Sequence, residues 1–71
     1  MFPLAMAQQG EKWVIQKIMS EHEIKTRFME LGFCEGVQIT IMASEQGNVI
    51  IKNKDSTFAI DKDFAKHIFV N

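Results

Sequence analysis

A regular alternation of apolar and polar residues in the middle of the chain constrains its fold more than any other feature. From position 37 onward, every second residue is apolar: Val37, Ile39, Ile41 and Ala43. The positions between them, up to residue 44, carry Gln, Thr, Met and Ser. Successive side chains of a strand point to opposite faces, so this repeat of two predicts a half-buried strand. Such a strand must cover its apolar face with other elements.

Two turn signals divide the segment that follows into further short strands. Glu45–Asn48 and Asn53–Ser56 carry the Gly, Asn, Asp and Ser residues that tight turns favour. The elements that we expect beyond the first turn are strands over Val49–Asn53 and Thr57–Ile60, a helical turn over Asp61–Lys66 and a strand over His67–Val70.

A single helix is specified upstream of the alternating strand. Ser20 followed by Glu23 has the form of a capping box, in which each side chain bonds a free backbone N–H at the helix start. We expect a helix over His22–Leu31, preceded by an apolar-rich strand over Trp13–Met19.

The expected helix has one apolar face and a defined end. Ile24, Phe28 and Leu31 are spaced as one helical face, which predicts that all three point to the core. Gly32 supplies a left-handed stop after the last of them. Met29 lies about 130° from the direction of this face, at about 100° per residue, so it should not face the core.

Length and charge limit the class of protein. The chain has 71 residues and a net charge of −1, so it can build one small core over residues 1–71, and a domain of this size leaves little room for a deep substrate cleft. Its scattered Lys and Arg residues argue against nucleic-acid binding, which favours a basic excess. The single cysteine, Cys34, cannot form an internal disulfide, so folding does not require an oxidising compartment.

The order of these elements predicts a mainly β fold. About five short strands with tight turns, and a helix inserted after the first strand, suggest a small closed β-barrel in which no strand edge is exposed. We find no apolar stretch long enough to span a membrane and no basic region of a secretory signal, so we expect a cytoplasmic protein without direct membrane insertion. The oligomeric state is left open.

The residues at the joints between these elements resemble the FeoA family, the small cytoplasmic component of bacterial ferrous iron transport. The matching stretches are Pro3-Leu4 with Gly10, then Thr26–Phe33 with Gly36, then the Val37–Met42 strand, and finally Ala65, Ile68 and Val70. The family commonly has proline where this chain has Glu35 and an aliphatic residue where it has Phe28. Both departures bear on partner contacts, whereas neither breaks the turn or the apolar helical face.

The resemblance implies a fold and a partner. The implied fold is an SH3-like β-barrel with a helix after the first strand. The implied partner is the membrane ferrous iron transporter FeoB, which carries a cytoplasmic GTP-binding domain. The implied role is that of a non-enzymatic accessory or regulatory component. An alternative is a metal-sensing regulatory module related to the SH3-like domain of iron-dependent repressors.

We expect the partner to contact the end of the helix and the loop after it. An outward Met29 beside an apolar loop could form part of a docking patch, because Met adapts well to binding surfaces. An isolated exposed apolar residue is an equally good explanation. The expected contact residues are Met29, Glu30, Phe33, Cys34 and Glu35. Gly32 and Gly36 are better explained as turns that need a positive φ angle.

The sequence offers no metal, cofactor or catalytic motif. Cys34, His22 and His67 form no Cys/His cluster with the spacing of a zinc site. Asp61, Asp63 and His67 are close in sequence and could associate weakly with Fe(II). A solvated charged turn is the better explanation for them. We therefore predict no metal site, no cofactor and no enzymatic activity.

Overall fold

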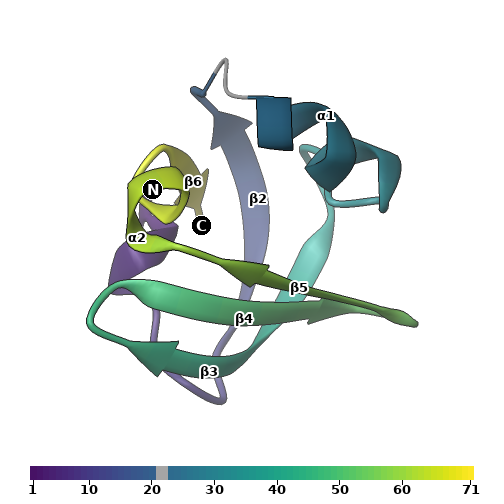
Figure 1. Ribbon diagram of the computed structural model, residues 1–71. Coiled ribbons are helices and arrows are strands. Elements are labelled where there is room, and N and C mark those ends of the chain that lie inside the picture. The colour runs from purple at the N-terminus through teal and green to yellow at the C-terminus, as the bar shows by residue number, and fades with distance from the viewer. Residues whose placement is uncertain (21–22) are drawn as a thin grey trace.

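The computed structural model describes residues 1–20 and 23–71, which form one coiled antiparallel sheet with two short helices (Figure 1). The elements are β1 (Phe2–Pro3), a 3-10 turn η1 (Leu4–Met6), β2 (Lys12–Ile18), α1 (Glu23–Glu30), β3 (Gln38–Glu45), β4 (Asn48–Asn53), β5 (Ser56–Ile60), α2 (Lys62–Ala65) and β6 (Ile68–Val70).

The expected strands and turns are confirmed to within two residues. In β3, Ile39 and Ile41 are 1% exposed, as the alternation predicts. Gln46 and Gly47 both have positive φ angles, of 51° and 88°, which is the backbone of a type I′ hairpin turn. The α1 helix is also confirmed over Glu23–Glu30. Its predicted start at His22 lies outside the described residues, as does the part of the predicted capping box that runs through residues 21 and 22.

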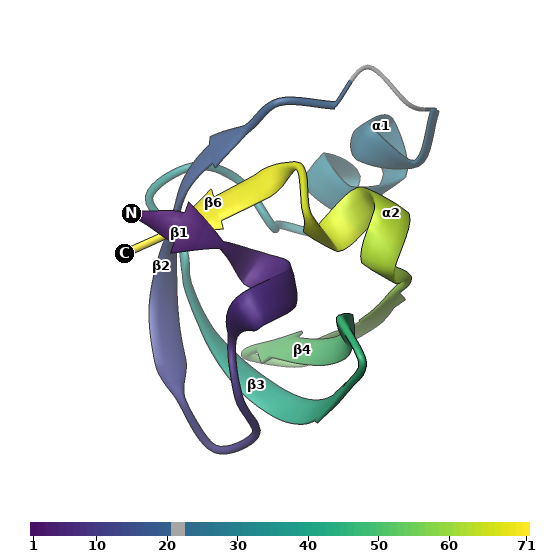
Figure 2. The same ribbon diagram turned by 90° about the vertical axis from the view of Figure 1, so that its left-hand side faces the viewer.

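The expectation of a closed barrel is wrong, because the sheet stays open between its first and last strands. Their order is β1-β6-β2-β3-β4-β5, so within the described residues β1 and β5 are edges. After β5 the chain turns into α2, which packs with η1 and β4 in the gap (Figure 2). In a closed barrel, β1 and β5 would be joined by hydrogen bonds. Here the buried side chains of Leu4, Ala7 and Phe64 fill the space between these strands. The sequence also gave no signal for β1, which has only two residues.

Two irregularities in strand pairing accompany the coiling of the sheet around its core. The register of β2 with β6 shifts between Ile15 and Lys17, and that of β3 with β4 shifts between Ile41 and Ala43. Such bulges bend a strand and increase its twist. The half-barrel that results encloses a core to which β2–β6, η1, α1 and α2 all contribute buried side chains.

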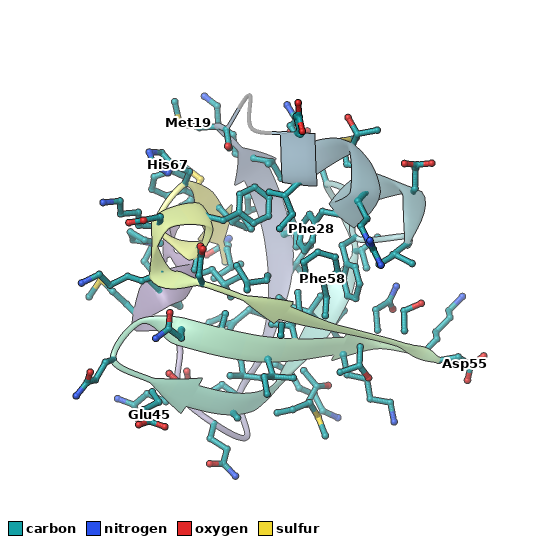
Figure 3. The ribbon with its side chains drawn as sticks, in the orientation of Figure 1. Met19, Phe28, Glu45, Asp55, Phe58 and His67 are labelled. Carbon is teal, nitrogen blue, oxygen red and sulfur yellow. The ribbon has the colours of Figure 1, made fainter. Side chains whose placement is uncertain are left out.

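An aromatic cluster fixes α1 to the rest of the molecule. Phe28 is fully buried, and its ring lies 5.0 Å from that of Phe33 in a stacked arrangement. It also meets Phe58 and Phe64 edge to face, each at 5.4 Å between ring centroids. Figure 3 shows Phe28 pointing from α1 toward Phe58 on β5. Phe28 is the one fully buried side chain that α1 contributes over residues 23–30, so the attachment of the helix depends on it.

We expect Phe28→Ala to lower the free energy of unfolding by about 3–5 kcal/mol, the usual cost of deleting a buried aromatic ring. That loss is close to the whole stability of a marginal domain, about 5 kcal/mol. Urea denaturation followed by tryptophan fluorescence measures it. Met29→Ala is the matched control, since the neighbouring Met29 is 41% exposed and should change the midpoint little. A small effect of Phe28→Ala would show that α1 is held by other contacts.

A carboxylate organises the turn that leads into β2. Glu11 Oε1 accepts a hydrogen bond of 2.7 Å from the Gln8 backbone N–H and one of 3.1 Å from the indole Nε1–H of Trp13. The bond from Gln8, and then that from Trp13, lower the pKa of Glu11 below its ordinary value of 4.5. Both bonds favour the ionised carboxylate over the neutral acid.

The lowered pKa of Glu11 predicts the direction of one pH effect. The charged form stabilises the fold fully above the unfolded-state pKa of 4.5, and this stabilisation is lost as the pH falls through the lower folded-state pKa. Glu11→Gln keeps an acceptor oxygen but removes the charge. The stability difference between the parent chain and this variant should therefore be largest near neutral pH and shrink on acidification. Thermal melts at several pH values measure it, and a constant difference would contradict the prediction.

Candidate functional site

A groove of about 1080 Å³ lies beside the end of α1. Four segments supply its lining: the start of β2, the end of α1, the outer face of β3 and the β4–β5 hairpin. The lining residues are Lys12, Leu31, Gly32, Val37, Gln38, Thr40, Met42, Lys52, Asn53, Lys54, Asp55 and Ser56. We call this surface the lysine groove. Figure 3 shows Asp55 at the tip of the hairpin that bounds it.

Strand register places the floor of the lysine groove. Inward Ile39 and Ile41 alternate with outward residues on β3, so Gln38, Thr40 and Met42 form an outer column along this strand. Thr40 pairs with Lys12 of β2 on one side and with Lys52 of β4 on the other. Directly paired residues share a face of a sheet, so the two lysines flank Thr40 in one row.

The end of α1 forms the wall of the lysine groove through a glycine turn. Gly32 has a φ angle of 95°, and its N–H donates to the Met29 carbonyl at 3.0 Å. The Phe33 N–H donates to the Phe28 carbonyl at 3.2 Å. This pair of bonds is a Schellman motif, which ends the helix and reverses the chain. The expected turn roles of Gly32 and Gly36, whose φ is 90°, agree with this geometry.

The turn corrects two expectations about which apolar residues face the core. Leu31 was expected on the core face of the helix but is 39% exposed at the groove rim. Phe33 was expected on an exposed docking patch but is fully buried. The reason is the Schellman motif, which turns the chain so that the Phe33 ring stacks under Phe28 and takes the place that a continuing helix would give to Leu31.

The other expected contact residues do lie at the surface. Met29 is 41% exposed, as its angle from the helical face predicts, while Glu30 and Glu35 are exposed and Cys34 is half-buried. The Cys34 thiol donates to the Met29 carbonyl at 3.6 Å. We call these four residues the exit-loop surface. It borders Leu31 but does not line the groove, and without Phe33 its apolar part is reduced to Met29 and Cys34. Its role in binding a partner stays a prediction.

The lysine groove carries uncompensated positive charge. Lys12, Lys52 and Lys54 are exposed, and only Asp55 among the lining residues is acidic. Within residues 1–20 and 23–71, the ion pair that the structure shows joins Lys66 to Asp63, at 3.7 Å, outside this surface. The sequence did not reveal this cluster, since the three lysines are up to 42 positions apart (54 − 12 = 42) and only strand register brings them together.

The acidic residues near the C-terminus have structural partners. Asp61 caps α2 by accepting from the Phe64 N–H at 2.9 Å, and Asp63 pairs with Lys66. His67 Nδ1 lies 2.8 Å from the Asp63 carbonyl oxygen. Across the described part of the chain, no three His, Cys, Asp or Glu side chains gather where they could hold a metal ion. His22, another potential ligand, lies outside the described residues.

Comparison with known proteins identifies relatives along nearly the whole chain. Residues 2–71 match the family model of the FeoA domain. A protein of Methanocaldococcus jannaschii, provisionally named Fe(2+) transport protein A, is 33% identical over 70 residues, which cover 99% of this chain and 85% of that protein. No helix in the described residues is long and apolar enough to cross a membrane.

Solved structures support the SH3-like fold. A crystal structure of an iron uptake regulatory protein (FeoA) has a TM-score of 0.84 at 24% identity and covers 99% of this chain and 93% of its own. Stenotrophomonas maltophilia FeoA, crystallised with zinc and described as a prokaryotic SH3 domain protein, has a TM-score of 0.83 at 22% identity, with coverage of 100% and 91%.

A manganese-dependent transcriptional repressor also shares the fold, with a TM-score of 0.85 at 15% identity, over 99% of this chain and 40% of that one. Because the family model and the M. jannaschii relative both extend over almost every residue, this chain belongs to the FeoA domain family.

Proposed function

We propose that this FeoA-family chain is a non-enzymatic accessory component of ferrous iron transport. In this proposal it works in the cytoplasm and docks on the cytoplasmic side of the GTP-dependent Fe(II) transporter FeoB. Family membership and the name of the M. jannaschii relative support the transport role. The FeoA family consists of transport accessory proteins and is not a known enzyme family, so membership of it also supports a binding role.

One observation carries the docking part of the proposal. Leu31 and Met42 are 39% and 45% exposed, and both line the lysine groove. They come from α1's exit and from β3, so the fold brings two exposed apolar side chains to one concave surface. Concave surfaces with apolar anchors and polar surroundings are typical of binding sites for other molecules. The exit-loop surface borders Leu31 and extends this contact region in the proposal.

The metal-sensing alternative has weaker support. The likeness to the manganese-dependent repressor is at 15% identity and indicates fold alone. The zinc belongs to the crystal of the S. maltophilia protein. Calorimetric titration of this chain with Fe(II) under anaerobic conditions tests the alternative, and binding at about micromolar affinity or better would favour metal sensing over docking.

We expect Leu31→Glu to weaken binding to the soluble cytoplasmic domain of FeoB by at least about tenfold, because it places a charge at an apolar anchor. Amide-shift NMR titration at physiological salt measures the affinity and locates the contact. Ile50→Glu is the matched control, since Ile50 is also 39% exposed but lies outside the groove. Equal effects of the two variants, or no binding by the parent chain, would count against the proposal.

The exit-loop surface is tested separately with Met29→Glu. If this surface takes part in docking, the variant should weaken binding severalfold, because it adds a third acid beside Glu30 and Glu35 and removes the exposed apolar side chain. Met6→Glu is a suitable control, because Met6 is 69% exposed and lies in η1. Unchanged affinity for the Met29 variant would confine docking to the groove.

A further inference from the structure

We infer that the lysine groove binds a short acidic segment of a partner protein, one that carries at least two carboxylates around an aliphatic side chain. This inference rests on the proposed docking function and names the chemistry of the docked segment. Three features of the groove support it: its charge, the spacing of its lysines and the apolar residues between them.

The charge of the groove has the opposite sign to that of the whole chain. Three lysines and one aspartate line it, which gives a local charge of +2 (3 − 1 = 2), whereas the chain as a whole carries −1. Like charges gathered on one surface repel each other unless a partner neutralises them. A negatively charged segment would therefore be attracted to this groove.

The spacing of the lysines sets the reach of the partner. Lys12 and Lys52 stand on strands either side of Thr40, so their backbones are two strand spacings apart, about 10 Å. Because the two lysines stand on opposite sides of β3, a separate carboxylate for each lysine allows both ion pairs to be short. A segment with two carboxylates, one for each side of β3, fits this row of side chains.

The apolar residues favour a peptide over a polynucleotide. Leu31, Val37 and Met42 line the same groove as the lysines, and a phosphate backbone gains nothing from such apolar side chains. Asp55 at the hairpin tip would also repel phosphates. A peptide with an aliphatic side chain between its carboxylates can contact both the lysines and these apolar side chains.

A designed peptide tests this chemistry directly. The probe is a synthetic Glu-Glu-Leu-Glu-Leu-Glu-Glu peptide, titrated into the isotopically labelled full chain by NMR. We expect shifts at lining residues such as Thr40, Met42 and Lys52, with binding that weakens severalfold as salt is raised. A peptide with Lys in place of each Glu, and one with Gly in place of each Leu, should both bind at least about tenfold more weakly.

Charge reversal with a matched control assigns the binding to the groove. Lys12→Glu combined with Lys52→Glu should weaken the peptide at least about tenfold, because both contacts become repulsive. Lys17→Glu combined with Lys66→Glu changes the net charge equally but alters exposed lysines outside the groove. Circular dichroism melts of both double variants confirm that each remains folded.

The same variants separate this inference from the proposed function. If the FeoB domain binds, and binding is lost with Leu31→Glu but unchanged with the Lys12/Lys52 variant, the acidic segment is wrong and the docking function stands. If the peptide binds the groove and the FeoB domain does not bind at all, the docking function fails and the inferred chemistry stands.

Other occupants give distinct results that overturn the inference. Tighter binding of single-stranded RNA than of the peptide, unaffected by Met42→Ser, would assign the groove to nucleic acid. Concentration-dependent self-association that disappears in the Lys12/Lys52 variant would assign it to the acidic exit-loop surface of a second copy. A flat peptide titration up to about millimolar concentration would exclude an acidic segment.

Discussion

The stacking of Phe28 on Phe33 is the contact on which the rest of this molecule depends. It joins the last turn of α1 to the loop that follows, and it is the hydrophobic contact that accompanies a Schellman motif. Phe28 also meets rings from β5 and α2, so one side chain ties the helix to an edge strand of the open sheet and to the helix that follows it. A short helix with few good neighbours of its own is stable only through such tertiary packing.

The lysine groove follows from this contact by simple geometry. Because Phe33 occupies the core, Leu31 is left at the surface, where it faces the outer side of β3. The exit loop is then held against β2, since the Gly36 N–H donates to the Ile15 carbonyl at 2.7 Å and the Ile15 N–H donates to the Val37 carbonyl at 2.9 Å. The rim and the floor of the groove are therefore parts of one packed unit. A partner can meet them without paying to order a flexible loop.

Sequence reasoning was reliable where a local pattern decides the structure and failed where distant segments compete for one space. The alternation in β3 and the Gln46-Gly47 turn are local, and both were predicted correctly. The choice between Leu31 and Phe33 for the core depends on how the chain reverses after Gly32, which helical spacing alone cannot show. Closure of the barrel depends on whether β5 meets β1, and α2 with η1 take that space instead. The row of Lys12, Thr40 and Lys52 likewise exists only after register is fixed.

Incomplete closure also bears on how a domain this small can carry a binding surface. In a closed barrel every strand would pair with two neighbours. Here β1 has only two residues, and the buried side chains of Leu4 and Phe64 fill the space between β1 and β5. The β2–β6 register shift lies between Ile15 and Lys17, whereas the β3–β4 shift begins at Ile41, directly after Thr40. Within the row that joins Lys12, Thr40 and Lys52 the pairing is regular. Regular pairing across this row fixes the separation of the two lysine backbones, while the shift beside it bends β3 around the core. The same strand therefore contributes to the core with one face and to a charged surface of defined geometry with the other.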